Sequence, residues 1–133
     1  MNARSLLIAF FATLTALLAI DALWLVVLMG PTYKAYLGDM MLAEPKWLPA
    51  GAFYLLFSAG LLVFAVMPAL RKHDWRTAAL LGAFLGLIGY GTYDLSNLAT
   101  LRGWPWQLTL IDMGWGALLA CLSAVAGYLA ASR

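Results

Sequence analysis

The chain has 133 residues, of which 65% are hydrophobic and only 11% are charged, with a formal net charge of +2. A soluble domain carries about a quarter charged residues, and one of this length lacks the interior volume to bury so many apolar side chains. The composition therefore excludes a water-soluble globular protein and makes the lipid bilayer the solvent. The small, scattered positive charge gives no indication of a nucleic-acid partner.

Four apolar segments follow one another, and each is long enough for a helix that crosses the hydrocarbon core. Such a helix needs about 20 apolar residues, and helices are required because each unpaired backbone group costs several kcal/mol in lipid. Short turns join antiparallel neighbours. We therefore predict an all-α integral membrane protein, a single membrane domain over residues 1–133 folded as an antiparallel four-transmembrane-helix bundle. The expected helices are 5–29, 47–70, 76–101 and 106–131, with an outer loop at 30–46.

The basic residues predict the orientation. Three of them lie at one set of helix ends, namely Lys34, Lys46 and Arg102. Five lie at the opposite ends, namely Arg4, Arg71, Lys72, Arg76 and Arg133. The positive-inside rule therefore places both termini in the cytoplasm. Four tryptophans near helix ends are expected to be interfacial anchors: Trp47, Trp75, Trp104 and Trp106.

The outer loop carries apolar and aromatic residues with the spacing of a short amphipathic helix between Pro31 and Pro45. These residues are Tyr33, Tyr36, Leu37, Met40, Met41 and Leu42. Such a helix either covers the helix ends as a lid or anchors the loop in the membrane interface. Both interpretations are open at this stage.

Polar residues of all four helices fall at one depth. Asp21, Tyr54, Asp94 and Asp112 each lie roughly six to eight residues from the outer end of their helix, which is roughly 10 Å below the outer interface. Ionisable groups at membrane depth are costly and indicate function by default. Because basic residues are absent from this layer, proton sharing or cation binding is favoured over buried salt bridges.

Helical spacing adds neighbours to these polar groups. Tyr90, Asp94 and Asn97 share one face, with Tyr93 on its flank. The same spacing of three residues pairs Asp21 with Trp24 and Asp112 with Trp115. The candidate ligand-binding residues are therefore Asp21, Trp24, Tyr54, Tyr90, Tyr93, Asp94, Asn97, Asp112 and Trp115.

Four motifs that contain these residues resemble a known family. The chain is similar over essentially its whole length to the bacterial four-helix inner-membrane proteins catalogued as domain of unknown function 2177. The motifs are "DALWL" at Asp21–Leu25, "FYLLFSAGLLVFAVMPAL" at Phe53–Leu70, "YGTYDLSNLATLRGWPW" at Tyr90–Trp106 and "IDMGWG" at Ile111–Gly116. The resemblance implies a multi-pass protein of the bacterial inner membrane, but it implies no activity, cofactor or substrate.

Three functions remain open. In the first, the carboxylates form the floor of a pocket in the outer half of the bilayer, with Trp24 and Trp115 as aromatic walls, and the pocket binds or modifies a lipid or small amphiphile. In an enzyme, one carboxylic acid would act as general acid and an ionised partner as base. A divalent cation is a weak variant because His residues and the usual ligand spacings are absent, so no metal site is predicted. The alternatives are a proton-coupled transporter acting as a homo-oligomer, and a structural subunit whose polar network fixes helix register.

Overall fold

The computed structural model describes the chain from Met1 to Arg133, except for the side chain of Leu28. Its regular structure is helical, and no strand occurs in the described part of the chain. Four helical stretches are long and apolar enough to cross a membrane: Ala3–Val27, Trp47–Lys72, Trp75–Thr100 and Trp106–Ala131. The prediction of an all-α chain with four apolar spans is confirmed.

Two of these stretches contain a wider π-helical turn. The first joins α1 (Ala3–Ala22) to the π-helix η1 (Leu23–Leu28), and the second joins α3 (Trp47–Leu61) to η3 (Leu62–Val66) and α4 (Met67–Lys72). Each π-helical turn lies shortly before a proline, Pro31 or Pro68. A proline removes one backbone donor and its ring clashes with the carbonyl group four residues earlier, so a widened turn relieves the strain.

The segment between the first two stretches contains the short helix α2 (Gly30–Leu37), followed by a 3-10 turn η2 (Gly38–Met40). The third stretch is α5 (Trp75–Thr100), which begins after Asp74; the Asp74 side chain accepts a hydrogen bond from the Arg76 amide. The fourth stretch, α6 (Trp106–Ala131), begins after Pro105. A helix thus occupies the first half of the segment that the sequence predicts as a loop.

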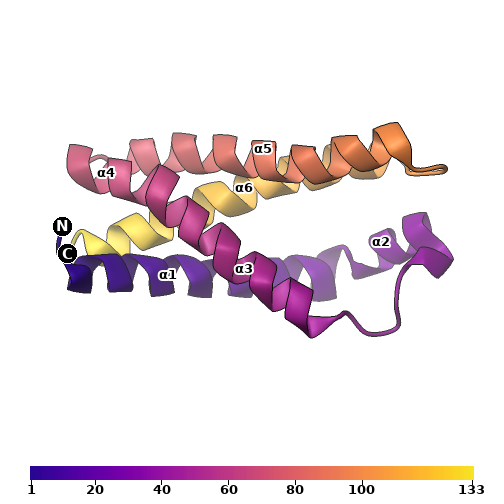
Figure 1. Cartoon of the computed structure of the whole chain (residues 1–133), viewed down its shortest axis with the longest axis horizontal. Helices are drawn as coiled ribbons and strands as arrows, with labels where there is room; N and C mark the ends of the chain where they lie inside the picture. Colours follow the sequence, from indigo (N-terminus) through magenta and orange to yellow (C-terminus); the bar gives the residue numbers. More distant parts are fainter.

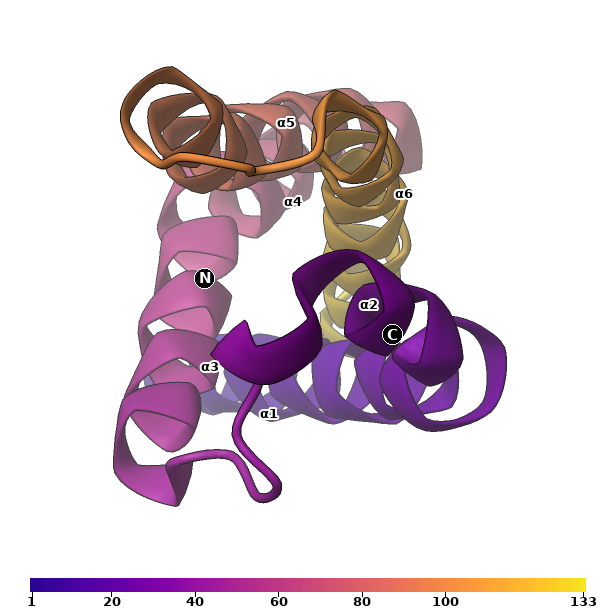
Figure 2. The ribbon, with the colours of Figure 1, turned by 90° about the vertical axis from the view of Figure 1, so that its right-hand side faces the viewer.

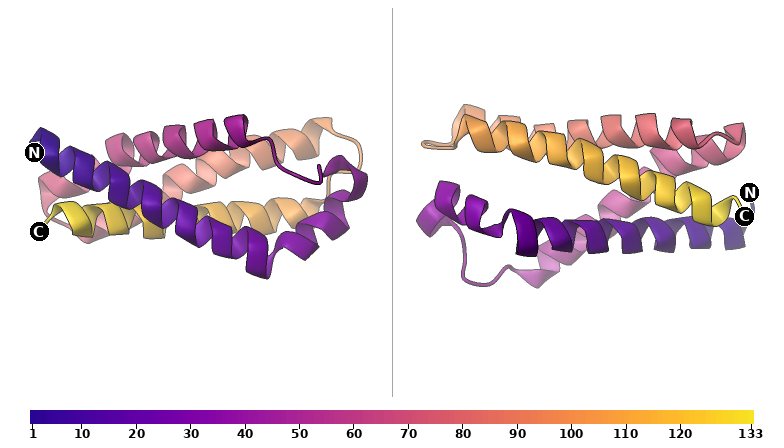
Figure 3. Two further views of the ribbon diagram at one scale, coloured as in Figure 1. Left: turned by 90° about the horizontal axis from the view of Figure 1, so that it is seen from below. Right: turned by 180° about the vertical axis from the view of Figure 1, so that it is seen from behind.

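Both termini lie at one end of the molecule, and α2 and the α5–α6 turn lie at the other (Figure 1). The most extensive interfaces are those of α6 with α5 and with α1. α3 crosses the others obliquely and packs on α1, while its continuation η3 packs on α5 (Figure 1). α1 and α6 are close near the termini and separate toward the other end (Figure 3). Seen from that other end, α2 lies in front of the middle of the bundle (Figure 2).

The apolar core lies in the half of the bundle that carries the termini. It consists mainly of small side chains, and its buried members are Ala9, Leu61, Ala65, Val66, Ala69, Ala78, Ala120, Ala124 and Tyr128. In lipid, helix association depends on close van der Waals contact, which small residues permit. One half of the bundle is therefore tightly closed, and the half that carries α2 is more open.

The closest approach of α5 and α6 is at Gly86 and Gly116. A methyl group at Gly86 would fall on the carbonyl oxygen of Gly116 and on the Ala120 side chain, and one at Gly116 would fall on the ring of Tyr90. Gly114 is exposed on the same helix as Gly116 and has open space around it. The absence of a side chain at Gly86 and Gly116 is therefore required for packing, whereas at Gly114 it is not.

We predict that Gly86→Ala destabilises the protein by about 1–3 kcal/mol, because the backbone of α6 cannot yield to the added methyl group. Gly114→Ala is the control and is expected to be neutral or slightly stabilising, since alanine is the better helix former. Thermal unfolding in detergent micelles, followed by a thiol-reactive dye at Cys121, compares the two variants. Equal unfolding midpoints would contradict the close packing of α5 and α6.

Candidate functional site

Asp21 lies near the end of α1 and is 6% exposed. Its carboxylate accepts hydrogen bonds from two other helices: the Tyr54 hydroxyl of α3 donates to Oδ2, and the Trp115 Nε1 of α6 donates to Oδ1 at 3.0 Å. A buried carboxylate is tolerated when such donors satisfy it. Asp21 therefore ties α3 and α6 to the end of α1.

Tyr33 makes a second connection, from α2 into the bundle. Its hydroxyl donates to Oδ1 of Asp112 at 2.6 Å and accepts from Nε1 of Trp24 at 2.9 Å. Burial raises the pKa of the Tyr33 phenol above its ordinary value, and the hydrogen bond to Asp112 raises it further. The hydroxyl therefore keeps its proton at neutral pH and remains a donor to Asp112.

The two connections are joined by a pair of stacked indoles. The rings of Trp24 and Trp115 lie 4.0 Å apart between centroids and are parallel to within 4°. The spacing of three residues in Asp21–Trp24 and Asp112–Trp115 places each pair on one helix face. In the folded chain each tryptophan is connected to the aspartate of the other pair. Trp115 of α6 donates to Asp21 of α1, and Trp24 of α1 donates to the tyrosine that holds Asp112 of α6.

A cavity of about 400 Å³ lies beside this network, toward the end of the bundle that carries α2. Its size falls in the range of small-molecule sites. Six of the nine predicted ligand-binding residues line it: Asp21, Tyr90, Tyr93, Asp94, Asp112 and Trp115. The remaining wall is mainly apolar and is formed by Leu25, Leu37, Met41, Phe53, Leu108 and Trp104, together with Tyr33 and Gly89.

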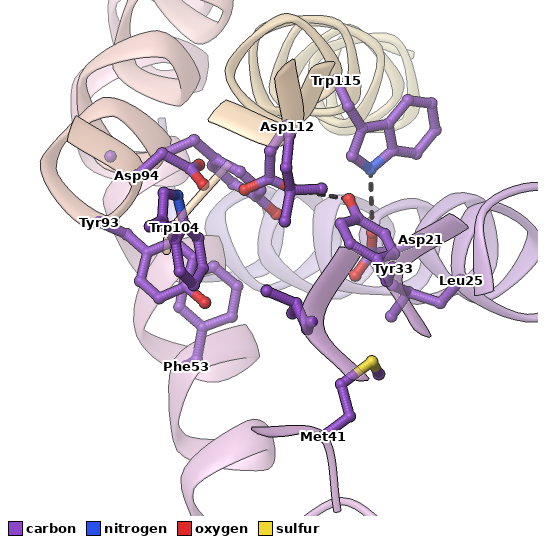
Figure 4. Close-up of a pocket in the computed structure, with 14 residues that line it drawn as sticks. Asp21, Leu25, Tyr33, Met41, Phe53, Tyr93, Asp94, Trp104, Asp112 and Trp115 are labelled. Carbon is purple, nitrogen blue, oxygen red and sulfur yellow. Dashed lines mark hydrogen bonds between the residues drawn. The ribbon is translucent and has the colours of Figure 1, made fainter. Parts of the chain in front are cut away.

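Asp94 differs from the other two carboxylates. It is fully buried on α5, and neither of its oxygen atoms has a hydrogen-bond partner in the described part of the chain. Its carboxyl group points toward that of Asp112 (Figure 4). Because both groups are acceptors when ionised, a proton between them or a donor from a ligand is needed to satisfy them.

The other predicted residues occupy distinct places. Tyr90 packs over Gly116 and lies edge-on to Phe53, with 6.3 Å between ring centroids. Tyr93 is 55% exposed and packs edge-on against Trp104 at 5.7 Å. Asn97 lies one turn beyond Asp94 and does not line the cavity.

Trp24 and Tyr54 are also absent from the cavity wall. The indole of Trp24 donates to Tyr33 and the hydroxyl of Tyr54 donates to Asp21, so Trp24 and Tyr54 hold two residues of the wall in position. The sequence predicted Trp24 as a wall like Trp115, but in the structure Trp115 lines the cavity and Trp24, which stacks on Trp115, does not.

Two polar wall residues were missed as site residues from the sequence. Tyr33 was assigned only to an amphipathic loop helix, although its spacing of four from Leu37 does put both on the inner face of α2. Trp104 was interpreted as an interfacial anchor. Its indole instead lines the cavity, with Nε1 donating to Oγ1 of Thr109 at 3.0 Å. Trp47, Trp75 and Trp106 are each more than half exposed.

The side chains around the three aspartates do not include a set of metal ligands. Among the described residues, no group of three or more His, Cys, Asp or Glu side chains lies close enough to hold a metal ion. Two of the carboxylates already accept hydrogen bonds from aromatic side chains.

Comparison with known proteins gives one match. The profile of the family described as "Predicted membrane protein (DUF2177)" matches residues 6–129 of the chain. Neither a curated protein nor a solved structure matches it. The resemblance expected from the four sequence motifs is thus confirmed, and the chain belongs to the DUF2177 family of predicted membrane proteins.

Proposed function

We propose that this protein is a bacterial inner-membrane protein whose residues 1–133 form one antiparallel four-helix domain with both termini in the cytoplasm. The position of both termini at one end of the molecule supports this topology (Figure 1). The excess of basic residues at the same end supports the orientation. The cavity then lies in the outer-leaflet half of the bilayer, with α2 on its periplasmic side.

This topology predicts which positions a membrane-impermeant maleimide reaches from the periplasm. In a Cys121→Ala background, Asp39→Cys in η2 is labelled in intact cells, whereas His73→Cys in the α4–α5 turn is labelled only after the membrane is permeabilised. Both positions are exposed, so the difference reports the side of the membrane. The reverse labelling pattern would require the opposite orientation.

We propose further that the cavity binds a small amphiphile, with the polar head at Asp94 and the apolar part along the wall. The observation that carries this proposal is the fully buried carboxylate of Asp94, which faces the cavity without a protein donor. A buried polar group left unsatisfied costs about 1–3 kcal/mol, and more when it is charged. A ligand that donates to Asp94 removes this cost, and the apolar wall suits a hydrocarbon chain.

The two other functions explain less of the geometry. A network that only fixes helix register accounts for Asp21 and its two donors, but it satisfies Asp94 only through a proton shared with Asp112. A transporter needs a path to the opposite side, and the half of the bundle beyond the cavity is filled by the alanine-rich core. Binding of an amphiphile from one side of the bilayer is therefore the function that the site supports best.

Dodecanol is a suitable probe for this binding, because it combines a hydroxyl donor with a single chain. A ligand at about 100 times its Kd stabilises the folded state by about 2.7 kcal/mol, so saturating dodecanol is expected to raise the unfolding midpoint of protein held in phosphatidylcholine nanodiscs.

Gly89→Leu is expected to abolish this rise. Gly89 lines the cavity where α5 faces α3, and a side chain there extends toward the ring of Phe57 and narrows the space. Gly114→Leu adds the same side chain in open space outside the cavity and is expected to keep the wild-type response. If dodecanol stabilises the two variants and the wild type equally, the cavity is not its binding site.

Tyr33→Phe tests the connection between α2 and the bundle. The substitution removes one donor to Asp112 and one acceptor of Trp24 while keeping the ring, so we expect a loss of about 1–3 kcal/mol in unfolding free energy. Hydrogen exchange of the α2 amides is expected to accelerate. Tyr36→Phe, at an exposed position of the same helix, is the control and is expected to change neither quantity. Unchanged α2 exchange in Tyr33→Phe would show that α2 is held by other contacts.

A further inference from the structure

The hydrogen bonds within the site leave carboxylate acceptors for a ligand, beside the hydroxyl groups of Tyr90 and Tyr93, which line the cavity and make no hydrogen bond in the described part of the chain. Asp21 accepts from two side chains and Asp112 accepts from Tyr33, whereas Asp94 accepts from none in the described part of the chain. The unused acceptor capacity is concentrated where Asp94 and Asp112 point toward each other (Figure 4). A head group that fits this place must donate several hydrogen bonds at once.

The charge of the site indicates the charge of the head group. None of the residues that line the cavity is a lysine, arginine or histidine. The one ion pair among the described side chains, Arg76 with Asp74, lies at the opposite end of the bundle. Buried charges cost several kcal/mol unless a partner of opposite sign accompanies them, so a cation is the complementary ligand.

The wall around Asp94 is also suited to a cation. The aromatic rings of Tyr93 and Trp104 lie near it (Figure 4), and Tyr90, one helical turn before Asp94 on α5, also lines the cavity. The faces of such rings attract ammonium groups, and the attraction is worth about 2 kcal/mol or more when the pair is desolvated. A phosphate group would find no basic side chain in this wall, which disfavours a phospholipid head group.

The cavity wall reaches the surface of the bundle on α3 and α5. α5 packs on η3 and α4, whereas α3 crosses away from it toward the end that carries α2 (Figure 1). Two wall residues on these helices, Phe53 on α3 and Tyr93 on α5, are 42% and 55% exposed. A hydrocarbon chain that lies along these two side chains is at the surface of the bundle while its head is at Asp94.

We propose, on the basis of the function proposed above, that the ligand is a single-chain amphiphile with a protonated primary or secondary amine as its head. The ammonium group donates to the carboxylates of Asp94 and Asp112, and the chain follows the cavity wall on α3 and α5 to the surface of the bundle. A chain amine carries its charge at neutral pH, as the lysine side chain does.

The test compares three probes of equal chain length on the protein in phosphatidylcholine nanodiscs: dodecylamine, dodecyltrimethylammonium and dodecanol. The apparent affinity of each is obtained from the dependence of the unfolding midpoint on probe concentration. Dodecylamine is expected to bind at least about ten-fold tighter than dodecanol, which is about 1.4 kcal/mol. Dodecyltrimethylammonium carries the charge but cannot donate hydrogen bonds, so its affinity is expected to be lower than that of dodecylamine.

Asp94→Asn is expected to bring dodecylamine to the affinity of dodecanol while dodecanol itself still binds. Asp39→Asn removes the same charge from an exposed position in η2 and is expected to leave the preference for the amine intact. The unfolding midpoint of each variant without probe shows whether the variant folds. The comparison of the three probes on the wild type tests the amine specificity even if a variant does not fold.

Two kinds of failure are distinguishable. If dodecylamine and dodecanol bind the wild type equally, and Gly89→Leu weakens both, the amine specificity is wrong while the amphiphile site stands. The amine specificity is also wrong if Asp94→Asn folds and keeps the preference for the amine. If neither probe shifts the midpoint of the wild type, both the amine specificity and the proposed function are overturned.

Discussion

A carboxylate buried in an apolar helix bundle must obtain its hydrogen-bond donors from other helices, and the arrangement of the half that carries α2 follows from that requirement. Asp21 at the end of α1 obtains them from Tyr54 and Trp115, and Asp112 on α6 obtains one from Tyr33. These contacts draw together α1, α2, α3 and α6 at the end where α1 and α6 separate (Figure 3). At this end, hydrogen bonds between polar side chains thus take the place of the close helix contacts that stabilise the end with the termini.

The two halves of the bundle are stabilised by different interactions. Near the termini the helices meet through alanines and glycines, whose small size brings backbones together and compensates for the absence of a hydrophobic driving force in lipid. Toward α2 the side chains are large and aromatic, and they pack around a space instead of filling it. The closely packed half thus stabilises the fold, while the half that carries α2 contains the cavity.

Asp94 is the group on which the proposed function of this open half depends. Asp21 shows that this chain is able to provide donors to both oxygen atoms of a buried carboxylate. Asp94 is equally buried, faces the cavity and has no donor among the described residues. This difference between the two carboxylates is the basis for proposing Asp94, and not Asp21, as the group that receives a ligand.

The sequence by itself determined the fold class and most of the polar wall. Long apolar stretches admit only membrane-spanning helices, because lipid offers no partner to backbone groups. Helical spacing then placed Asp21 with Trp24, and Asp112 with Trp115, on common faces. Equal depth in the four helices predicted that Asp21, Asp94 and Asp112 lie in one layer, and all three side chains line the cavity.

The tertiary structure decided how these residues divide their roles. Tyr33 is 79 residues from Asp112 in the chain, and their hydrogen bond depends on the turn at Met29 and Gly30 that returns α2 over the bundle. Helical spacing also could not tell that Asn97 and Trp24 lie outside the cavity wall, or that Trp104 forms part of it. Periodicity sets the face of a helix on which a residue lies. Which donor reaches which carboxylate, and that Asp94 is left without one, depends on how the helices cross, and only the packed bundle determines that.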